Sequence, residues 1–385
     1  MKRIYVDHAA TTPVHPEVIR VMTDTMTSII GNPSSIHAHG REARQIVDQA
    51  RTTAAKSINA KFQEIIFTSG GTEADNMAIL GTAWANRHRG NHIITSAIEH
   101  HAVLHTCEFL EKNGFDVTYL PVGRDGRVRV EDVKDALRDN TILVTIMYAN
   151  NEVGSIQPIQ EIGELLKDHP AYFHTDAVQA FGTLPIDVKK VGIDLLSVSS
   201  HKITGPKGIG FLYAREGLKL APTSFGGEQE RKRRAGTENV AAIAGFAKAI
   251  EITSETYEQK NEYYSQLKTL FIEILKDEGI PFSINGACET LPHIVNVSFP
   301  GTNVEQMLVN LDLEGISASS GSACTAGSLE PSHVLAAMYG KDSEELYNSI
   351  RFSFGYGNTE EDITLVAKKT SAIVKRLVAP TKEVK

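Results

Sequence analysis

The chain has 385 residues, of which 41% are hydrophobic, and a formal net charge of −8. This length exceeds what one hydrophobic core usually organises, so we expect two domains, or one large domain with a smaller partner. The negative balance argues against general nucleic-acid binding, because contacts with phosphates require an excess of basic residues. The basic run at residues 231–234 is an exception, and either a solvated loop or a functional segment explains it.

The cysteine content and the N-terminus bear on the compartment. The chain has three cysteines, Cys107, Cys288 and Cys324, too few for a disulfide framework and in keeping with a reducing compartment. No apolar run follows Met1, and no window approaches the length of a membrane span. We therefore expect a cytoplasmic protein that binds neither membranes nor, directly, nucleic acids.

The N-terminal segment predicts a short strand over residues 4–6 and a helix that begins at Pro16. Turn residues at 31–35 then lead into a long polar helix. His37 stands where that helix begins, and we interpret it as a structural hydrogen-bonding residue.

A buried-type strand over residues 64–69 runs into Gly70, Gly71 and Thr72, which open a helix that continues through Leu80. The free backbone N–H groups of such a helix start, together with the helix dipole, form a cradle for an anion. No Gly-Lys-Ser/Thr sequence follows, so this is not a nucleotide P-loop. We predict that Gly71 and Thr72 bind a phosphate group.

Strands predicted at residues 93–96, 115–120 and 141–147 alternate with helices. Such alternation predicts a largely parallel sheet, whose ligands bind at the carboxyl ends of the strands.

A cluster of His100, His101, His105 and Cys107 follows the first of these strands. The spacing of His101 and His105 places both on one helix face and could suit a metal ion. No carboxylate occupies the general-base position and no third distant ligand is identifiable, so we predict no firm metal site here.

Two later strand ends carry residues suited to amine chemistry. The strand over residues 172–176 ends at Asp176, and the strand over residues 194–198 leads into Ser199, Ser200, His201 and Lys202. A lysine whose amine pKa is lowered forms a Schiff base with a carbonyl compound such as pyridoxal phosphate (PLP). Asp176 would keep the pyridine nitrogen protonated, and Gln179 would reach the ring's 3-oxygen. We predict pyridoxal 5'-phosphate as the cofactor.

The C-terminal part differs in character. We predict helices over residues 240–251, 257–278, 304–311 and 332–338, and strands over residues 294–298 and 350–353. The small, polar segment 317–329 around Cys324 is expected to be a mobile loop. Arg351 has a planar fork that suits a carboxylate, with a structural salt bridge as the alternative.

Four motifs together resemble those of the cysteine desulfurases of the NifS/IscS type: T-S-G-G-T-E at 68–73, D-A-x-Q at 176–179, S-x-H-K at 199–202 and S-G-S-A-C-T at 320–325. These enzymes are class V aminotransferases of fold type I, and the resemblance extends from Tyr5 to Ser353. It implies an α/β fold with a large PLP-binding domain, residues 14–258, built on a mostly parallel seven-stranded sheet flanked by helices. A smaller α+β domain, residues 1–13 and 259–385, would carry the Cys324 loop.

The resemblance also implies a role for each matched residue. His100 would stack on the PLP ring and act as an acid or base, which requires a pKa near neutrality. The cofactor-binding residues would be Gly71, Thr72, His100, Asn151, Asp176, Gln179, Ser199, Ser200, His201, Lys202 and, across the interface of a homodimer, Thr237. The substrate would be held by Arg351, Asn151 and Asn32. Several relatives have alanine at the position of Gly71, and we expect that change to have no effect because the backbone does the binding.

The implied reaction converts L-cysteine to L-alanine. Lys202 would take the α-proton, and Cys324 would attack the substrate sulfur and keep it as a persulfide. A cysteine among Ser, Gly and Ala gains little from apolar packing, which favours a nucleophile over a buried structural thiol; Cys107 and Cys288 are interpreted as structural. The long loop implies sulfur delivery to an Fe–S scaffold or a tRNA-thiolating protein, with transient Fe–S ligation by Cys324 as a secondary role.

Other interpretations stay open. A selenocysteine lyase or a cysteine sulfinate desulfinase would share the whole scaffold, and a non-catalytic sulfur-transfer scaffold would keep the fold without turnover. The physiological sulfur acceptor does not follow from the sequence.

Overall fold

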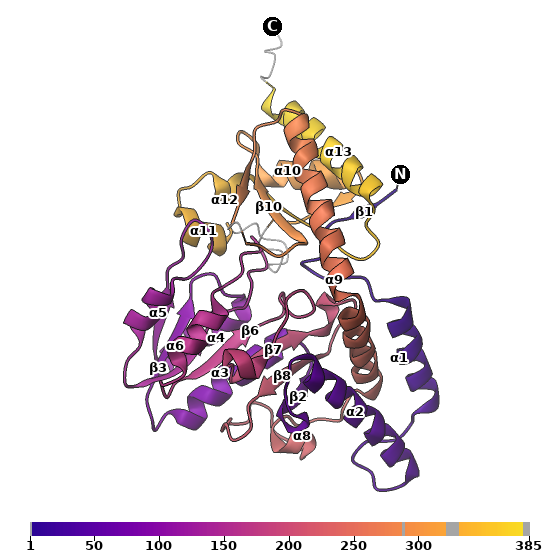
Figure 1. The fold of residues 1–385 in the computed structure, drawn as a ribbon, viewed down its shortest axis with the longest axis vertical. Helices are drawn as coiled ribbons and strands as arrows, with labels where there is room; N and C mark the ends of the chain where they lie inside the picture. The colour runs from indigo at the N-terminus through magenta and orange to yellow at the C-terminus, as the bar shows by residue number, and fades with distance from the viewer. Residues whose placement is uncertain (1, 287–288, 321–330, 380–385) are drawn as a thin grey trace.

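The computed structural model describes residues 2–286, 289–320 and 331–379. Figure 1 shows a large helix-flanked sheet with a smaller unit above it. The long helix α9, Val240–Asp277, runs from the large part into the small one. It packs against α1 and α2 in the large part and against α13 in the small part.

The large part is built on a seven-stranded sheet. Its strands, in spatial order, are β2 (Ile65–Thr68), β8 (Gly210–Ala214), β7 (Leu195–Ser199), β6 (Tyr172–Asp176), β5 (Thr141–Thr145), β3 (His92–Ser96) and β4 (Asp116–Leu120). All neighbouring pairs are parallel except β2 with β8 and β7 with β8, which are antiparallel. The predicted mostly parallel, seven-stranded α/β sheet is confirmed.

Strand β8 had no counterpart in our sequence prediction. Its apolar run is short, and such runs do not reveal by periodicity whether they form a strand or a buried helix. Only residues 200–209 separate it from β7, and they contain a single 3-10 turn, Ser200–Lys202. A parallel neighbour would need a crossover of a dozen or more residues, so this short connection makes β8 antiparallel.

Helices cover both faces of the sheet. They are α1 (Pro16–Ser28), α2 (Ala38–Ser57), α3 (Gly71–Asn86), α4 (His101–Lys112), α5 (Val130–Ala136), α6 (Ile159–Leu166), α7 (Val188–Val191) and α8 (Gln229–Lys232). Histidines cap three of them: Nδ1 of His15, His37 and His100 accepts a backbone N–H in the first turn of α1, α2 and α4. The structural hydrogen bond predicted for His37 is thereby confirmed, and such a cap contributes about 1 kcal/mol.

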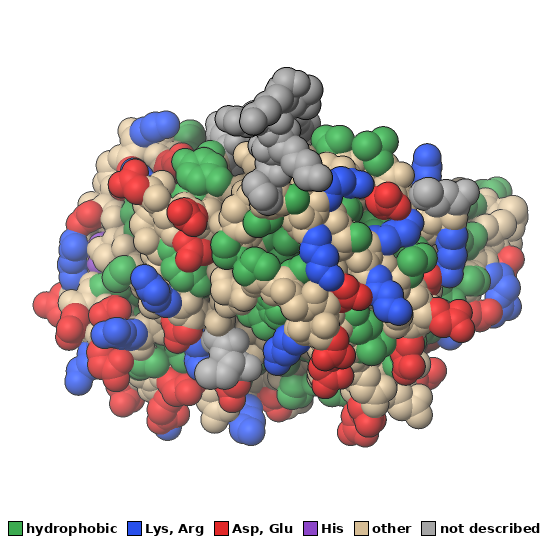
Figure 2. All heavy atoms as spheres, turned by 90° about the horizontal axis from the view of Figure 1, so that it is seen from above, with side chains coloured by type: hydrophobic (Ala, Val, Ile, Leu, Met, Phe, Trp, Pro, Cys, Tyr) green, Lys and Arg blue, Asp and Glu red, His purple; other side chains and the backbone are tan. Residues whose placement is uncertain are grey.

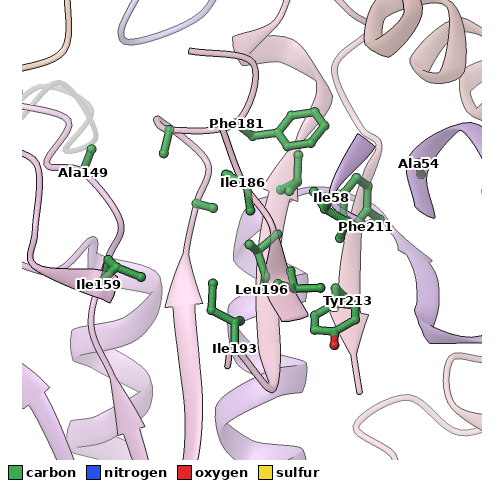
Figure 3. Close-up of a cluster of buried hydrophobic side chains, with 14 of the residues drawn as sticks. Ala54, Ile58, Ala149, Ile159, Phe181, Ile186, Ile193, Leu196, Phe211 and Tyr213 are labelled. Atoms are coloured by element: carbon green, nitrogen blue, oxygen red, sulfur yellow. The ribbon is translucent and has the colours of Figure 1, made fainter. Parts of the chain in front are cut away.

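The main hydrophobic core lies against this sheet. Leu196 of β7 and Phe211 and Tyr213 of β8 gather with Ile58 and Ile186 (Figure 3). All of them are less than a tenth exposed. Since every residue of β7 and β8 is buried, neither strand shows the alternation of a half-exposed strand.

The small part has its own core and sheets. β9 (Ser283–Asn285), β10 (Ile294–Ser298) and β12 (Ser349–Ser353) form an antiparallel sheet, and β1 (Ile4–Tyr5) pairs in parallel with β11 (Ile316–Ser317). The helices are α10 (Val304–Leu313), α11 (His333–Tyr339), α12 (Glu345–Asn348) and α13 (Glu360–Val378). Ile4 and Val6 belong to the second hydrophobic core. We propose on this basis the domain division at 14–258 against 1–13 and 259–385.

Helix α9 corrects one prediction. Separate helices over residues 240–251 and 257–278 were expected, but Val240–Asp277 is one continuous helix. The polar residues at 253–256 interrupt the apolar pattern, yet they include neither Pro nor Gly, so the backbone hydrogen bonds continue.

No helix in the described ranges combines the length and the apolar character needed to cross a bilayer. Figure 2 looks onto the end of the molecule that carries the small part, and it shows acidic and basic side chains interspersed over that face.

Candidate active site

A cavity of about 410 Å³ opens where the carboxyl ends of β5, β6 and β7 meet the first turns of α3 and α4. Parallel strands bring their carboxyl ends to one edge of the sheet, which is why residues distant in sequence converge here. The predicted residues that line it are Gly71, Thr72, His100, Asn151, Asp176, Gln179, Ser199, His201, Lys202 and Arg351.

Asp176 provides the acidic group of the cavity. It is the last residue of the buried strand β6 and is itself 6% exposed. Burial raises the pKa of its carboxyl to about 6, although the backbone N–H of Val178, at 2.9 Å, and nearby Lys202 oppose the shift. A carboxylate in this setting is stabilised by any cationic group placed against it.

Lys202 lies at the end of the 3-10 turn that follows β7. Its Nζ donates to the backbone oxygens of Ala9 at 2.5 Å and Ala10 at 2.9 Å. These two hydrogen bonds join the loop after β7 to the N-terminal segment. They hold the amine at the boundary between the two parts of the fold.

His100 reaches the cavity from the start of α4. Its Nδ1 accepts the N–H of Ala102 at 3.1 Å, which fixes the orientation of the ring. Burial, followed by the charge of Lys202, lowers its pKa to about 4. The expected pKa near neutrality is therefore not what the described chain produces: burial and the positive charge of Lys202 favour the neutral ring.

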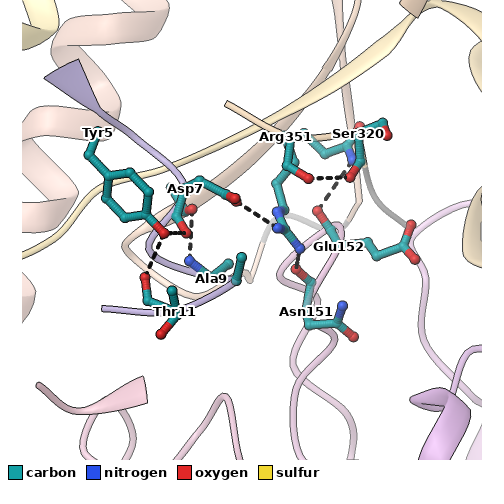
Figure 4. A network of polar contacts seen from close by, with 12 residues as sticks. Tyr5, Asp7, Ala9, Thr11, Asn151, Glu152, Ser320 and Arg351 are labelled. Carbon is teal, nitrogen blue, oxygen red and sulfur yellow. Dashed lines mark hydrogen bonds and ion pairs between the residues drawn. The ribbon is translucent and has the colours of Figure 1, made fainter. Parts of the chain in front are cut away.

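Arg351 is 1% exposed and projects from β12 into the cavity (Figure 4). Its Nη1 donates to the backbone oxygen of Asn151 at 2.9 Å, and its Nη2 contacts Asp7 Oδ1 at 2.8 Å. Its Nε is buried and has no hydrogen-bond partner among the described residues. The guanidinium therefore makes the salt bridge that we considered as an alternative, and it also faces the cavity where a carboxylate could bind.

Asn150 and Asn151 divide their work. Asn150 accepts the N–H groups of Glu152 and Val153 and donates to Ile98, so it fixes the turn after β5. Asn151 lines the cavity.

The start of α3 has the backbone arrangement expected of an anion cradle. Gly70, at φ +152°, adopts a backbone conformation that L-residues rarely take, and Gly71 begins the helix. A Cβ on Gly71 would lie 2.7 Å from Cγ2 of Val178. We expected alanine to have no effect here, but in this chain the β-branched Val178 side chain would have to move to make room for it.

Comparison with known proteins identifies the family of this chain. The class V aminotransferase family model matches residues 4–366. A putative cysteine desulfurase IscS 1 of Bacillus subtilis (strain 168) is 61% identical over 378 residues, which cover 98% of this chain and 100% of that protein. A cysteine desulfurase IscS of Methanosarcina thermophila is 52% identical, covering 98% of this chain and 93% of that protein. The chain belongs to the class V aminotransferases of the NifS/IscS cysteine desulfurase type.

Solved structures support the same assignment. A NifS-like protein superimposes with a TM-score of 0.91 at 36% identity, covering 97% of this chain and 100% of that one. SspA in complex with cysteine gives a TM-score of 0.82 at 39% identity, covering 92% and 99%. The NifS/IscS-type fold and family predicted from the motifs are confirmed.

Three further predicted residues line this cavity of the cysteine desulfurase: Gln179, Ser199 and His201. Gln179 Nε2 donates to Ala9 at 2.9 Å, and His201 Nδ1 lies 3.1 Å from Thr11 Oγ1. Burial, then Lys202 and Lys207, lower the pKa of His201 to about 4. Ser199 lines the cavity, whereas Ser200 does not.

Several predicted residues lie elsewhere in the chain. Ser200 is buried with its Oγ beside Gly205, where a Cβ would approach it to 2.0 Å. Asn32 is exposed, and its Oδ1 accepts the N–H of Ser34. Thr237 is also exposed and does not line this cavity, so a phosphate contact would have to be made to another subunit.

Of the three cysteines, Cys107 is among the described residues. Cys324 and Cys288 lie outside the described residues. Cys107 is fully buried in α4, and burial raises the pKa of its thiol, in keeping with a structural role.

Asp75 is a cavity residue that our reading of the sequence missed. It is 1% exposed, and burial, then the charge of Asp176, raise its pKa well above the usual value. Asp75, His100 and Asp176 bring their ligand atoms within 4.8 Å of one another, which would also suit a metal ion. The nearby Lys202 ammonium opposes a cation here. Asp75 lies one helical turn after Gly71, on the helix face that meets the strand ends. This spacing was the signal available in the sequence.

Proposed function

We propose that the chain is a PLP-dependent cysteine desulfurase that converts L-cysteine to L-alanine and receives the sulfur on Cys324. The observation that carries this proposal is the convergence of Asp176, Lys202 and Arg351 on one cavity of about 410 Å³. This chemistry requires three groups: an acid beside the ring nitrogen, an amine that reacts with the carbonyl, and a guanidinium that binds the substrate carboxylate.

The cavity residues fit PLP. The volume of the cavity falls within the usual range of cofactor pockets, roughly 300–1,000 Å³. Asp176 is a buried acid with a raised pKa, so a protonated ring nitrogen would supply the missing charge. The start of α3, with Gly71 and Thr72, offers N–H groups and a helix dipole to a phosphate. Lys202 and Gln179 would meet the carbonyl and the 3-oxygen.

When bound, PLP supplies the electron sink for the α-carbon of the substrate. Asp176 would hold a proton on the ring nitrogen, and the neutral ring of His100 would help to exclude water from the cavity. Arg351 and Asn151 bind the carboxylate of L-cysteine, which orients the Cα–H bond. Lys202, whose amine lies at the boundary of the cavity, takes that α-proton.

Cys324 completes the reaction in this proposal. Its thiolate forms an S–S bond with the substrate sulfur as the Cβ–S bond breaks, and the bonding pair stays on carbon, which takes up a proton and leaves as alanine. The sulfur then passes to an Fe–S scaffold or a tRNA-thiolating protein, and transient Fe–S ligation by Cys324 would be a secondary role. We propose a cytoplasmic homodimer for this work, in which Thr237 of each subunit serves the other.

The test is alanine formation from L-cysteine and a reductant, with the visible spectrum of the bound cofactor recorded. We expect Cys324→Ala to keep the spectrum and lose both persulfide and alanine, and Cys288→Ala to keep all three. Equal alanine formation by Cys324→Ala would remove that residue from the mechanism. An inactive wild type that binds PLP would favour the non-catalytic scaffold.

Substrate preference separates the nearer alternatives. The cysteine bound in the SspA relative favours L-cysteine. Parallel assays with L-selenocysteine and L-cysteine sulfinate should give lower kcat/KM values than L-cysteine; the reverse order would make the chain a selenocysteine lyase or a sulfinate desulfinase.

A further inference from the structure

A second cavity, of about 350 Å³, shares Lys202 with the candidate active site. Its walls come from the N-terminal segment, from α9 and from the chain beside β10 and β12. Apart from Lys202 it shares no residue with the cavity assigned to the cofactor and substrate. The reaction proposed above therefore leaves this space without a role.

The basic side chains that line the second cavity include His8, Lys260 and His293. His8 is 4% exposed, and Nδ1 of both His8 and His293 is buried without a hydrogen-bond partner in the described part of the chain. Lys260 Nζ donates to the backbone oxygen of Gly182 at 2.6 Å, and an ammonium has two further hydrogens to donate. Buried nitrogens of this kind normally have partners, so their convergence points to a bound molecule.

The basic side chains around the cavity have no acidic counterpart among the described residues of its wall. They are Lys202, Lys260, His8, His15 and His293. Burial lowers the pKa of His8 to about 4 and that of Lys260 to about 8; burial, then Lys260, lower that of His293 to about 3. Each shift disfavours a cation that has no acidic partner, and an anion in the cavity would compensate it.

The rest of the wall combines threonine, Gln259 and Asn358 side chains with apolar and aromatic ones. Ile203, Ile252, Tyr264 and Phe354 line it. The volume is near the lower limit of ligand pockets, about 300 Å³. This combination suits a ligand with one anionic end and a short apolar body rather than a bare inorganic ion.

We propose that this second cavity binds a small monocarboxylate, whose oxygens accept hydrogen bonds from Lys260 and from the imidazoles of His8 and His293. The apolar wall would cover the aliphatic body of the ligand. The site is distinct from the Arg351 fork and would operate whether or not the substrate site is filled.

Calorimetric titration of the PLP-loaded dimer tests the proposal. The probes are propionate, its neutral counterpart propionamide, and chloride. We expect propionate to bind about tenfold or more tightly than propionamide, because the neutral amide loses a charge-assisted hydrogen bond. Equal binding of the two, or no binding of propionate, would overturn the proposal, as would binding of chloride alone.

Matched variants locate the bound propionate. Lys260→Met should weaken binding about tenfold or more, whereas Lys268→Met and Arg351→Gln should not. Lys268 is the appropriate control because it is a half-buried lysine of the same helix that does not line the cavity. Loss of binding in Arg351→Gln with retention in Lys260→Met would place propionate in the substrate site and overturn the proposal. If the melting curve shows that Lys260→Met is unfolded, His293→Phe takes its place with the same expected loss.

Discussion

Arg351 illustrates how one side chain serves both the fold and the site. Its fork is divided between the Asp7 carboxylate and the Asn151 backbone, at 2.8 and 2.9 Å (Figure 4). A buried guanidinium without a counter-ion would be strongly destabilising, so Asp7 keeps the charge in place before substrate arrives. A substrate carboxylate then needs only the part of the fork that faces the cavity.

Arg351→Lys keeps the charge but loses the planar fork. We expect the KM for L-cysteine to rise about tenfold or more, since one charge-assisted hydrogen bond is lost, with a smaller change in kcat. Arg20→Lys, at an exposed ion pair with Glu17, is the control and should leave both constants unchanged. Steady-state kinetics measure both constants. A wild-type KM in Arg351→Lys would show that Arg351 makes only the salt bridge and does not bind the substrate.

Glu99 gives the protein a pH-dependent stability. Burial raises the pKa of its carboxyl to about 8, against hydrogen bonds donated by Ser96 and the Met147 N–H. A carboxyl whose pKa is raised on folding stabilises fully below its unfolded pKa, and this contribution is lost as the pH rises through 8.

Glu99→Gln should therefore gain stability relative to wild type between pH 5 and pH 8, by up to about 1.4 kcal/mol per pH unit. Denaturant unfolding at several pH values measures this difference. Glu108→Gln, on the exposed side of α4, should follow the wild-type profile. Parallel profiles for Glu99→Gln and wild type would show that Glu99 does not titrate in this range.

At the scale of elements, the α3 start depends on its fit to the strand ends. Gly71 has no room for a Cβ because Cγ2 of Val178 would lie 2.7 Å from it. We expect Gly71→Ala to lower the free energy of unfolding by about 1–3 kcal/mol through overpacking.

Adding Val178→Ala to Gly71→Ala should restore part of that loss, since the clash is removed. Urea unfolding of both single variants and the double variant forms a double-mutant cycle. Additive losses would mean that the two side chains do not compete for the same space, contrary to the geometry.

Elements also differ in how well the sequence predicted them. The strands that end at the cavity were predicted because each apolar run leads into polar residues. Strand β8 and the continuity of α9 were not, since both depend on what packs against them.

At the scale of the whole molecule, Thr237 is exposed and outside the cavity of its own chain. The loop before it is anchored by Arg234, which makes two contacts with Glu73 in the first turn of α3, at 2.7 and 3.1 Å. This anchoring ties the loop to the start of α3 and leaves Thr237 exposed, as the proposed exchange between subunits requires.

Mixed dimers of Lys202→Ala and Thr237→Ala subunits test the proposed exchange. We expect the Lys202→Ala dimer to be less active than wild type, and the Thr237→Ala dimer to be less active at limiting PLP. A random mixture should recover about a quarter of wild-type activity, because about half of the dimers are mixed and each has one complete site. Activity equal to the mean of the parents would show that Thr237 serves no partner site.

The resemblance to the NifS/IscS type supplied matched site residues such as His100 and Asn151, and the sequence by itself determined the alternating α/β order and the strand ends that carry the site. These depend on local periodicity and on residue chemistry, which are written along the chain. Tertiary structure alone decided that Asp7 holds Arg351, that Asp75 joins Asp176, that Ser200 faces Gly205 rather than the cavity, and that basic residues surround a second cavity beside Lys202. Those features arise where segments far apart in sequence are packed together, so burial and charge there depend on neighbours that no local pattern specifies.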